Sequence, residues 1–245
     1  MWSVKVKSYI KTLSDKYLHG WERQSTVVLI TTAVILTLHR NYSRTRYYRE
    51  NLTEYFDFLP LEASHPYYYW FLTTAISLFF IPVIVAAIGT NQRLRDYGIR
   101  LGKQRLGWGV TLASWLLMIP VVIVAVKVYP PFAQKYPFCK EVASSWQAFL
   151  PYQLAYGIYM FSWEFFFRGF MLFGLEKRFG NYSILIQTIP FAVMHFSKPL
   201  PEALGSIVAG ILLGALALES RSFVYGAAIH WLVAMTMDTV CVLVS

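Results

Sequence analysis

Long apolar runs separated by short polar segments make up most of the chain. A helix needs about 20 apolar residues to cross the hydrocarbon of a bilayer. A first run, residues 25–38, is short for this purpose and would need thinning of the bilayer or neighbouring residues to cross. Six further runs are clearer candidates: residues 67–88, 108–126, 146–173, 182–196, 202–218 and 223–244. The pattern predicts an all-α integral membrane protein with a bundle of six to seven transmembrane helices.

The polar intervals divide the chain into two regions. Residues 1–24 alternate apolar and basic groups, which is typical of an amphipathic helix lying at the membrane interface. Residues 39–66 are polar and read as a loop with interfacial helix. We therefore predict an N-terminal membrane region over residues 1–145, with the amphipathic helix and two to three spans, and a core of four transmembrane helices over residues 146–245.

Composition agrees with this prediction. Only 14% of the residues are charged and 56% are hydrophobic, whereas soluble domains are about 25% charged. The net charge of +9 comes from basic residues at the ends of apolar runs, where they meet anionic lipid headgroups, so we expect membrane lipids and not nucleic acid as partners. Their excess on the N-terminal side predicts a multi-pass protein with a cytoplasmic N-terminus. The two cysteines form no CxxC pair, which excludes a thiolate zinc site.

Ionisable residues inside membrane helices are costly, and each is therefore a candidate for function. The N-terminal spans contain almost none, so any chemistry is expected in the last hundred residues. The candidates there are Glu164, Arg168, His195, Glu202, His230 and Asp238.

Glu164 and Arg168 are four residues apart, so on a helix they share one face and can pair. This pair could be a structural ion pair or a carboxylate tuned for acid–base work. His230 lies in mid-span without a polar neighbour within a turn, which predicts a partner on another helix. His195 lies at the end of its span, where an interfacial or capping role competes with catalysis. Glu202 opens the next helix, where a carboxylate suits the positive end.

Small residues form a stripe along the predicted helix 202–218, and such stripes permit close helix packing. They are Gly205, Ser206, Ala209, Gly210 and Gly214.

One carboxylate and two imidazoles on three helices favour hydrolysis by one of two routes. Glu164 could activate water while His195 and His230 orient it and stabilise the oxyanion, with Arg168 orienting the carboxylate and no cofactor required. Alternatively, the same Glu164, His195 and His230 could bind zinc. The HExxH helix that usually presents zinc ligands is absent, which favours the metal-free route.

The order Glu-x-x-x-Arg-Gly, Phe-x-x-x-His and a mid-helix His resembles the CPBP family of intramembrane proteases, over residues 146–240. That family includes the CAAX prenyl endopeptidases, the bacteriocin-processing and self-immunity (Abi-like) proteins and the lysostaphin-resistance type. A stretch before the third predicted span, residues 96–100, is also similar. The resemblance implies cleavage of a membrane-associated peptide or of a prenylated, CAAX-type C-terminal tail.

Two positions depart from the family pattern. The first motif usually reads Glu-Glu-x-x-x-Arg, and its first glutamate is usually given the water-activating role; here Trp163 stands at that position. The third motif usually has Asn or Asp four residues after its histidine, and here that residue is Ala234. Asp238, two turns beyond His230, cannot simply replace it.

Four interpretations therefore stay open. Glu164 could itself be the base, with His195 orienting the water. Glu202 could supply the missing carboxylate. The protein could be a catalytically silent relative that acts in binding or bacteriocin self-immunity. A transporter would need broken helices in both halves of the chain, and the absence of polar residues from the first half argues against it.

Overall fold

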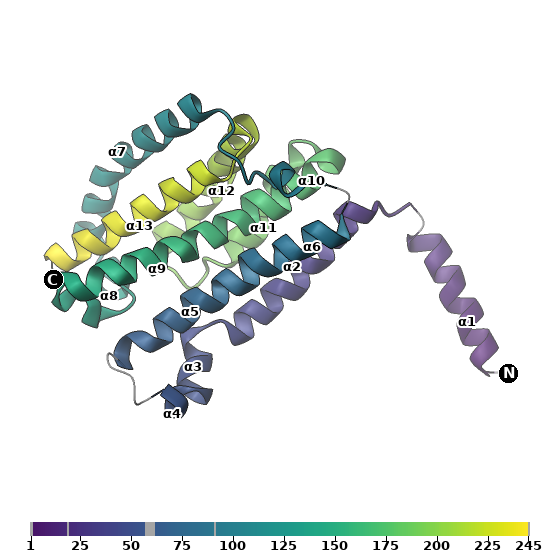
Figure 1. Ribbon diagram of the computed structural model, residues 1–245, viewed down its shortest axis with the longest axis horizontal. Helices are drawn as coiled ribbons and strands as arrows, with labels where there is room; N and C mark the ends of the chain where they lie inside the picture. Colours follow the sequence, from purple (N-terminus) through teal and green to yellow (C-terminus); the bar gives the residue numbers. More distant parts are fainter. Residues whose placement is uncertain (1, 19, 57–61, 91, 245) are drawn as a thin grey trace.

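The computed structural model describes residues 2–18, 20–56, 62–90 and 92–244, and within these ranges every regular element is a helix (Figure 1). This confirms the predicted all-α membrane class. Four helical segments of the described chain are long and apolar enough to cross a membrane: α5–η3–α6 (His65–Ala75, Ile76–Phe80, Ile81–Gly89), α7 (Gln104–Val128), α12 (Leu200–Ser220) and α13 (Val224–Val244).

The N-terminal region begins with two helices that differ in their packing. The first, α1 (Trp2–Leu13), continues into η1 (Ser14–Leu18) and stands clear of the bundle in Figure 1. The second, α2 (Arg23–Tyr42), packs against α6 and α10. It is longer than the predicted 25–38, because the Glu22 carboxylate accepts hydrogen bonds from the backbone N–H groups of Gln24 and Ser25 and caps the helix.

Short elements connect the long helices. The predicted polar loop 39–66 contains α3 (Thr45–Asn51), α4 (Thr53–Phe56) and η2 (Glu62–Ser64), while its residues 57–61 lie outside the described chain. Between the later helices lie η4 (Leu94–Tyr97), α8 (Pro131–Lys135) and η5 (Lys140–Ser144).

The most buried helical segment runs through the middle of the bundle. It consists of α9 (Trp146–Glu164), the π-helical η6 (Phe165–Met171) and α10 (Leu172–Phe179). Figure 1 shows α9 between α13 on one side and α5 on the other, in agreement with its contacts. Every residue of η6 is buried. Single π-helical turns inside α-helices often occur at functional sites, and this one carries Arg168.

The next helix, α11 (Tyr182–Val193), ends two residues before His195. The predicted span 182–196 is therefore too long at this end. Pro190 lies inside α11, and the backbone after it tightens into bonds of the i→i−3 type from His195 to Ala192 and from Phe196 to Val193. His195 thus lies in the turn between α11 and α12.

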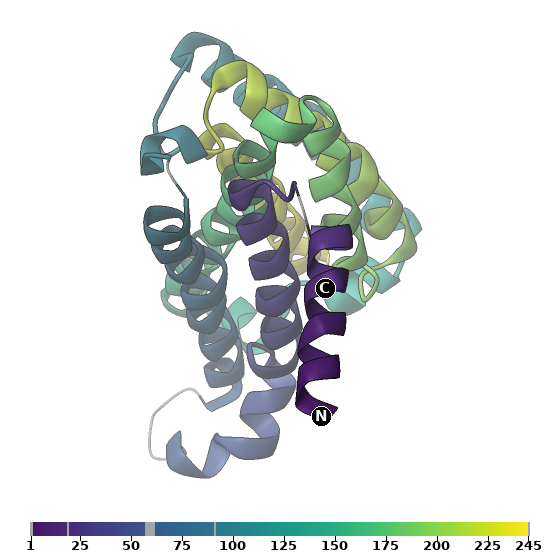
Figure 2. The ribbon, with the colours of Figure 1, turned by 90° about the vertical axis from the view of Figure 1, so that its right-hand side faces the viewer.

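Close approach of α11 and α12 confirms the prediction from the small-residue stripe. A Cβ atom on Gly210 would come within 2.7 Å of the Thr188 side chain, and Gln187 Nε2 donates to the Gly210 carbonyl oxygen at 2.9 Å. Figure 2 shows the molecule turned by 90°, with α1 toward the viewer and the helices of the bundle running upright behind it.

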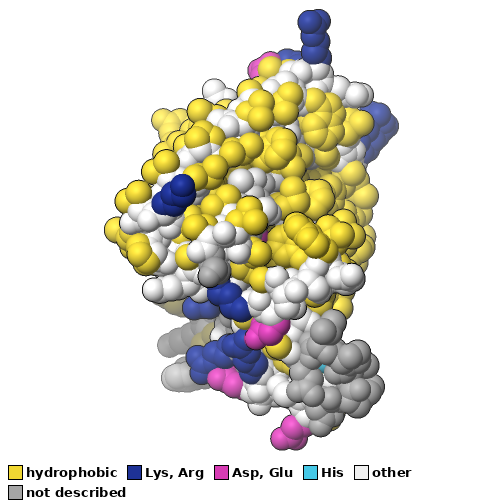
Figure 3. Space-filling model, turned by 90° about the vertical axis from the view of Figure 1, so that its left-hand side faces the viewer, with side chains coloured by type: hydrophobic (Ala, Val, Ile, Leu, Met, Phe, Trp, Pro, Cys, Tyr) yellow, Lys and Arg dark blue, Asp and Glu magenta, His cyan; other side chains and the backbone are white. Residues whose placement is uncertain are grey.

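The outer surface is mostly apolar, as expected for contact with lipid. Figure 3 shows a largely hydrophobic face whose acidic and many of whose basic side chains gather toward its ends. Large apolar side chains on the long helices are exposed, including Leu117 of α7 at 69% and Leu212 of α12 at 62%. The chain is an integral membrane protein on this evidence together with its four apolar helices.

Candidate active site

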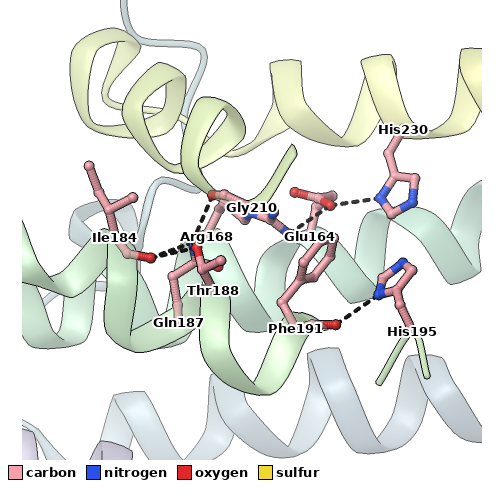
Figure 4. A network of polar contacts seen from close by, with 9 residues as sticks. All are labelled: Glu164, Arg168, Ile184, Gln187, Thr188, Phe191, His195, Gly210 and His230. Atoms are coloured by element: carbon pink, nitrogen blue, oxygen red, sulfur yellow. Dashed lines mark hydrogen bonds and ion pairs between the residues drawn. The ribbon is translucent and has the colours of Figure 1, made fainter. Parts of the chain in front are cut away.

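The predicted pair of Glu164 and Arg168 forms at the centre of the bundle (Figure 4). Nη1 of Arg168 donates to Oε1 of Glu164 at 3.0 Å, and both side chains are fully buried. A buried charge is stable only when it is paired, so each residue holds the other in its ionised form. Glu164 is the last residue of α9 and Arg168 lies in η6.

Phe191 forms one wall of this ion pair. The guanidinium carbon of Arg168 lies 3.9 Å from the centroid of the Phe191 ring, a cation–π contact. Phe191 is on α11, so this contact fixes the arginine from a second helix. The same residue therefore serves the site in two ways, because its backbone carbonyl also accepts a hydrogen bond from His195.

His230 has the partner across the bundle that its isolated position predicts. Its Nδ1 lies 2.7 Å from Oε1 of Glu164, although the two residues are 66 positions apart in the sequence. An ionised carboxylate only accepts hydrogen bonds, so Nδ1 carries the proton and Nε2 has a free lone pair. The His230 side chain is 21% exposed, whereas Glu164 is not exposed at all. In the contact between Glu164 and His230, His230 is therefore the residue that solvent can reach.

His195 lies beside His230 but makes a different hydrogen bond. Its Nδ1 is 2.7 Å from the carbonyl oxygen of Phe191, which fixes the proton on Nδ1 and leaves Nε2 as an acceptor. The two imidazole rings are nearly parallel, with their centroids 6.5 Å apart. In Figure 4 the Nε2 atoms of both rings lie away from their bonded partners. Two acceptor nitrogens thus face one region at the edge of the buried pair.

The two positions that depart from the family pattern, Trp163 and Ala234, make apolar contacts. Trp163 is buried and its ring lies edge-on to His195, with centroids 6.0 Å apart. It fills the space among Tyr159, Phe167 and Phe191. Ala234 packs against the main core and has no polar side-chain atom to offer. The described site therefore contains one carboxylate, Glu164.

Glu202 takes part in a separate polar cluster. Its two carboxylate oxygens accept hydrogen bonds from the Tyr136 hydroxyl at 2.7 and 2.8 Å, and Lys198 Nζ lies 3.2 Å from Oε1. Lys198 also donates to the Tyr136 hydroxyl. Burial, and then the charge of Glu202, raise the pKa of Tyr136 well above its ordinary value. No hydrogen bond joins Glu202 to His195 in the described chain.

Asp238 also lies apart from the pair. It is fully buried, and its Oδ2 accepts a hydrogen bond from Gln153 Nε2 at 2.7 Å, while Oδ1 has no partner among the described residues. Gln153 was not among the predicted site residues because its side chain is not ionisable. Its polarity in the middle of an apolar helix was the available signal.

The alternative of a bound zinc ion concerns the same side chains. The described residues contain no group of three or more His, Cys, Asp or Glu side chains placed to hold one metal ion. Oε1 of Glu164 already accepts hydrogen bonds from Arg168 and His230, whereas its Oε2 has no partner in the described chain. The metal-free route stays a prediction.

Fold and site together define a class: an all-α integral membrane protein with a buried Glu–Arg pair, joined by histidines from two other parts of the bundle. Residues 145–236 match the protein-family model for type II CAAX prenyl endopeptidases, Rce1-like. This match confirms the resemblance to the CPBP family and indicates a protease-related function of the CAAX type. It extends from α9 to α13 and includes Glu164, Arg168, His195 and His230. No curated protein and no solved structure gives a significant match to the chain.

Proposed function

We propose that this protein is an intramembrane endopeptidase that hydrolyses a peptide bond in a membrane-associated peptide or in a prenylated, CAAX-type C-terminal tail. The observation that carries the proposal is the contact between Glu164 Oε1 and His230 Nδ1, which pairs a buried, ionised carboxylate with an accessible imidazole. A carboxylate that orients a histidine and stabilises its protonated form is a recurrent arrangement in hydrolases.

In the proposed mechanism the glutamate acts through the histidine. Nε2 of His230 accepts a proton from a water molecule, and Nε2 of His195 accepts the second hydrogen bond of that water and so orients it. The water oxygen attacks the scissile carbonyl carbon to form a tetrahedral intermediate. His230 then returns the proton to the amide nitrogen as the carbon–nitrogen bond breaks, releasing a carboxylic acid and an amine.

Arg168 has a positioning role in this scheme. It holds the Glu164 carboxylate at the end of α9 and keeps it ionised, and it does not reach the substrate because it is fully buried. No step of the mechanism uses a metal or another cofactor. We therefore expect full turnover in the presence of a chelator, and loss of activity on chelation with recovery on adding zinc would contradict the proposal.

The deciding experiment measures cleavage of prenylated and tail-anchored peptides by the purified protein in lipid. Wild type is compared with Glu164→Gln and with Glu219→Gln, the same exchange at an exposed carboxylate of α12 outside the pair. We expect Glu164→Gln to abolish cleavage, and Glu164→Gln/Arg168→Met, which leaves no buried charge unpaired, to stay folded and to be equally inactive. Equal cleavage by wild type and Glu164→Gln would contradict the proposed function.

A catalytically silent protein that binds membrane peptides or acts in self-immunity is the second candidate. Trp163 and Ala234 favour it, because neither offers the polar group that the family pattern usually has there. Its signature would be peptide binding without cleavage across a broad panel of substrates, unchanged in Glu164→Gln.

The orientation in the membrane is proposed from charge. The excess of Lys and Arg on the N-terminal side favours a cytoplasmic N-terminus in a cell or inner membrane. Labelling of single cysteines introduced at Lys7 and at Arg105 by a membrane-impermeant reagent on sealed cells tests this orientation. Labelling at Lys7 from outside would reverse it.

A further inference from the structure

A pocket of about 380 Å³ opens beside the turn that carries His195. One wall is the C-terminal end of α2, and the other is the end of α11 with the following turn. Met194 and Phe196, the two neighbours of His195, both line it. Whatever occupies this pocket therefore lies against the turn that carries His195.

Two arginines give the pocket a positive charge. Arg40, in the last turn of α2, and Arg44, the residue before α3, both line it. Neither has a carboxylate within ion-pair distance among the residues that the structure describes. A third cation is near, because Lys135 Nζ donates to the carbonyl oxygen of Ser197, another residue of the wall, at 2.8 Å.

Arg44 differs from an ordinary interfacial arginine. Its guanidinium carbon lies 5.2 Å from the centroid of the Trp70 ring, and its Nε is buried with no hydrogen-bond partner in the described chain. Burial, together with the nearby charge of Arg40, lowers the pKa of Arg44. A partly buried guanidinium without a counter-ion is energetically costly, and binding an anion would lower that cost.

We propose that this pocket binds the C-terminal carboxylate of the peptide substrate. The inference rests on the proposed protease function and deepens it by naming what the enzyme recognises. A guanidinium presents donors that match a carboxylate in a bidentate manner, and such charge-assisted bonds are among the strongest in proteins. The free end of a peptide chain is the carboxylate that a protease encounters in every unmodified tail.

The position of the pocket sets how far from the end the peptide is cut. An extended chain advances about 3.3–3.6 Å per residue. Because the pocket borders the turn of His195, only a few residues fit between the scissile bond and the bound carboxylate. The protein should therefore cut close to a free C-terminus and should discriminate against tails that continue past it.

Anionic lipid headgroups are the other source of negative charge near these arginines. They would suit Arg40, which is exposed, better than Arg44, which is half-buried over Trp70. A wall formed by the turn of the catalytic histidine favours a peptide over a lipid in this pocket. The two sources differ in their dependence on lipid composition, and this difference is used in the test.

The test compares one membrane-associated peptide in three forms: with a free C-terminal carboxylate, with a carboxamide, and with five residues appended. Cleavage is measured for wild type, Arg40→Gln/Arg44→Gln, Arg44→Lys, and the control Arg105→Gln, an exposed arginine on α7 that does not line the pocket. We expect wild type and control to prefer the free acid by about tenfold to a hundredfold in kcat/KM, mainly through KM. The double variant should lose this preference, and Arg44→Lys should keep only part of it.

Three results would overturn the inference. They are equal cleavage of the acid and the amide by wild type, a preference for the acid that survives in the double variant, and a loss of cleavage of both peptides by that variant in proportion to the anionic lipid of the vesicles. The last result would assign the arginines to headgroups. Absence of all cleavage would instead count against the proposed protease function. In that case binding of the fluorescent acid and amide peptides to wild type and double variant decides on the pocket: equal binding of both would refute it.

Discussion

Gly226 of α13 lies directly against the carboxylate of Glu164: a Cβ atom on this glycine would come within 3.2 Å of Oε2. Oε2 is buried and has no hydrogen-bond partner in the described chain. The missing side chain is what allows α13 to approach α9 closely enough for His230 to reach Oε1, one helical turn further along. A glycine on one helix thus sets the geometry of the Glu164–His230 pair.

Replacing Gly226 with valine should therefore disturb catalysis more than folding. The branched side chain would push the carboxylate away from His230, and a displacement of about 1 Å at a catalytic group can cost about 100-fold in rate. Gly205→Val is the matched control, because a Cβ atom there meets nothing within 4 Å. We expect kcat/KM to fall in Gly226→Val and to be unchanged in the control. Near-normal cleavage by Gly226→Val would show that the contact does not set the site.

The ion pair makes separable contributions to stability and to activity. Arg168→Met leaves the Glu164 charge buried without its main partner and should lower the free energy of unfolding by about 3–5 kcal/mol. Adding Glu164→Gln removes that charge and should recover most of the loss, as measured by thermal unfolding in detergent. Both variants should be inactive. An active double variant would contradict the role given to Glu164.

Glu202 can be tested as the substitute base. Because its carboxylate is held by Tyr136 and Lys198, we expect Glu202→Gln to leave kcat within about threefold of wild type, a change of under 1 kcal/mol in barrier. Loss of cleavage comparable to that of Glu164→Gln would give Glu202 a part in the reaction, which the proposed mechanism with His230 as the base does not.

The stability of the same variant should depend more steeply on pH than that of the wild type. In the wild-type protein burial lowers the pKa of Lys198, and Glu202 raises it. Without Glu202 the lowering remains, while the unfolded chain keeps a pKa of about 10.5. The unfolded state then binds more protons below that value, so the stability of Glu202→Gln should rise as the pH is raised from 7 toward 10. Melting temperatures at pH 7 and 9 check this, with Glu202→Gln/Lys198→Met as the pH-independent control.

We expect Asp238 to contribute to the stability of the fold and not to the reaction. Gln153→Leu removes the hydrogen bond to its Oδ2 and leaves a buried carboxyl group without a partner, at a cost of about 1–3 kcal/mol. Gln153→Leu/Asp238→Leu should restore stability, and neither change should alter kcat, because both residues lie apart from Glu164. A large fall in kcat in the double variant would place Asp238 in the reaction.

Several features of the site could be read from residue spacing. The i, i+4 interval of Glu164 and Arg168 predicted their contact because the helix itself imposes it. The isolation of His230 in an apolar span predicted a partner on another helix, because an unpaired polar group is costly there. The identity of that partner could not be predicted, since many registers of α13 against α9 satisfy the same sequence.

Other features depend on packing that no local pattern records. The end of α11 at Val193 follows from the tightening of the backbone after Pro190, which moves His195 into a turn. Lys198 and Tyr136 are 62 residues apart and meet only in the fold. The pocket with Arg40 and Arg44 was hidden in a segment that reads as a polar loop, because its second wall comes from a helix more than 140 positions later.

The sequence by itself determined the membrane class, the helical runs and the set of ionisable residues, because burial in hydrocarbon constrains composition and hydrogen bonding along each helix separately. The tertiary structure decided which of these residues meet. Distances between helices depend on small residues such as Gly226 and Gly210 and on side-chain packing across the bundle. Both depend on how two helix surfaces fit together, which the sequence of either helix alone does not specify.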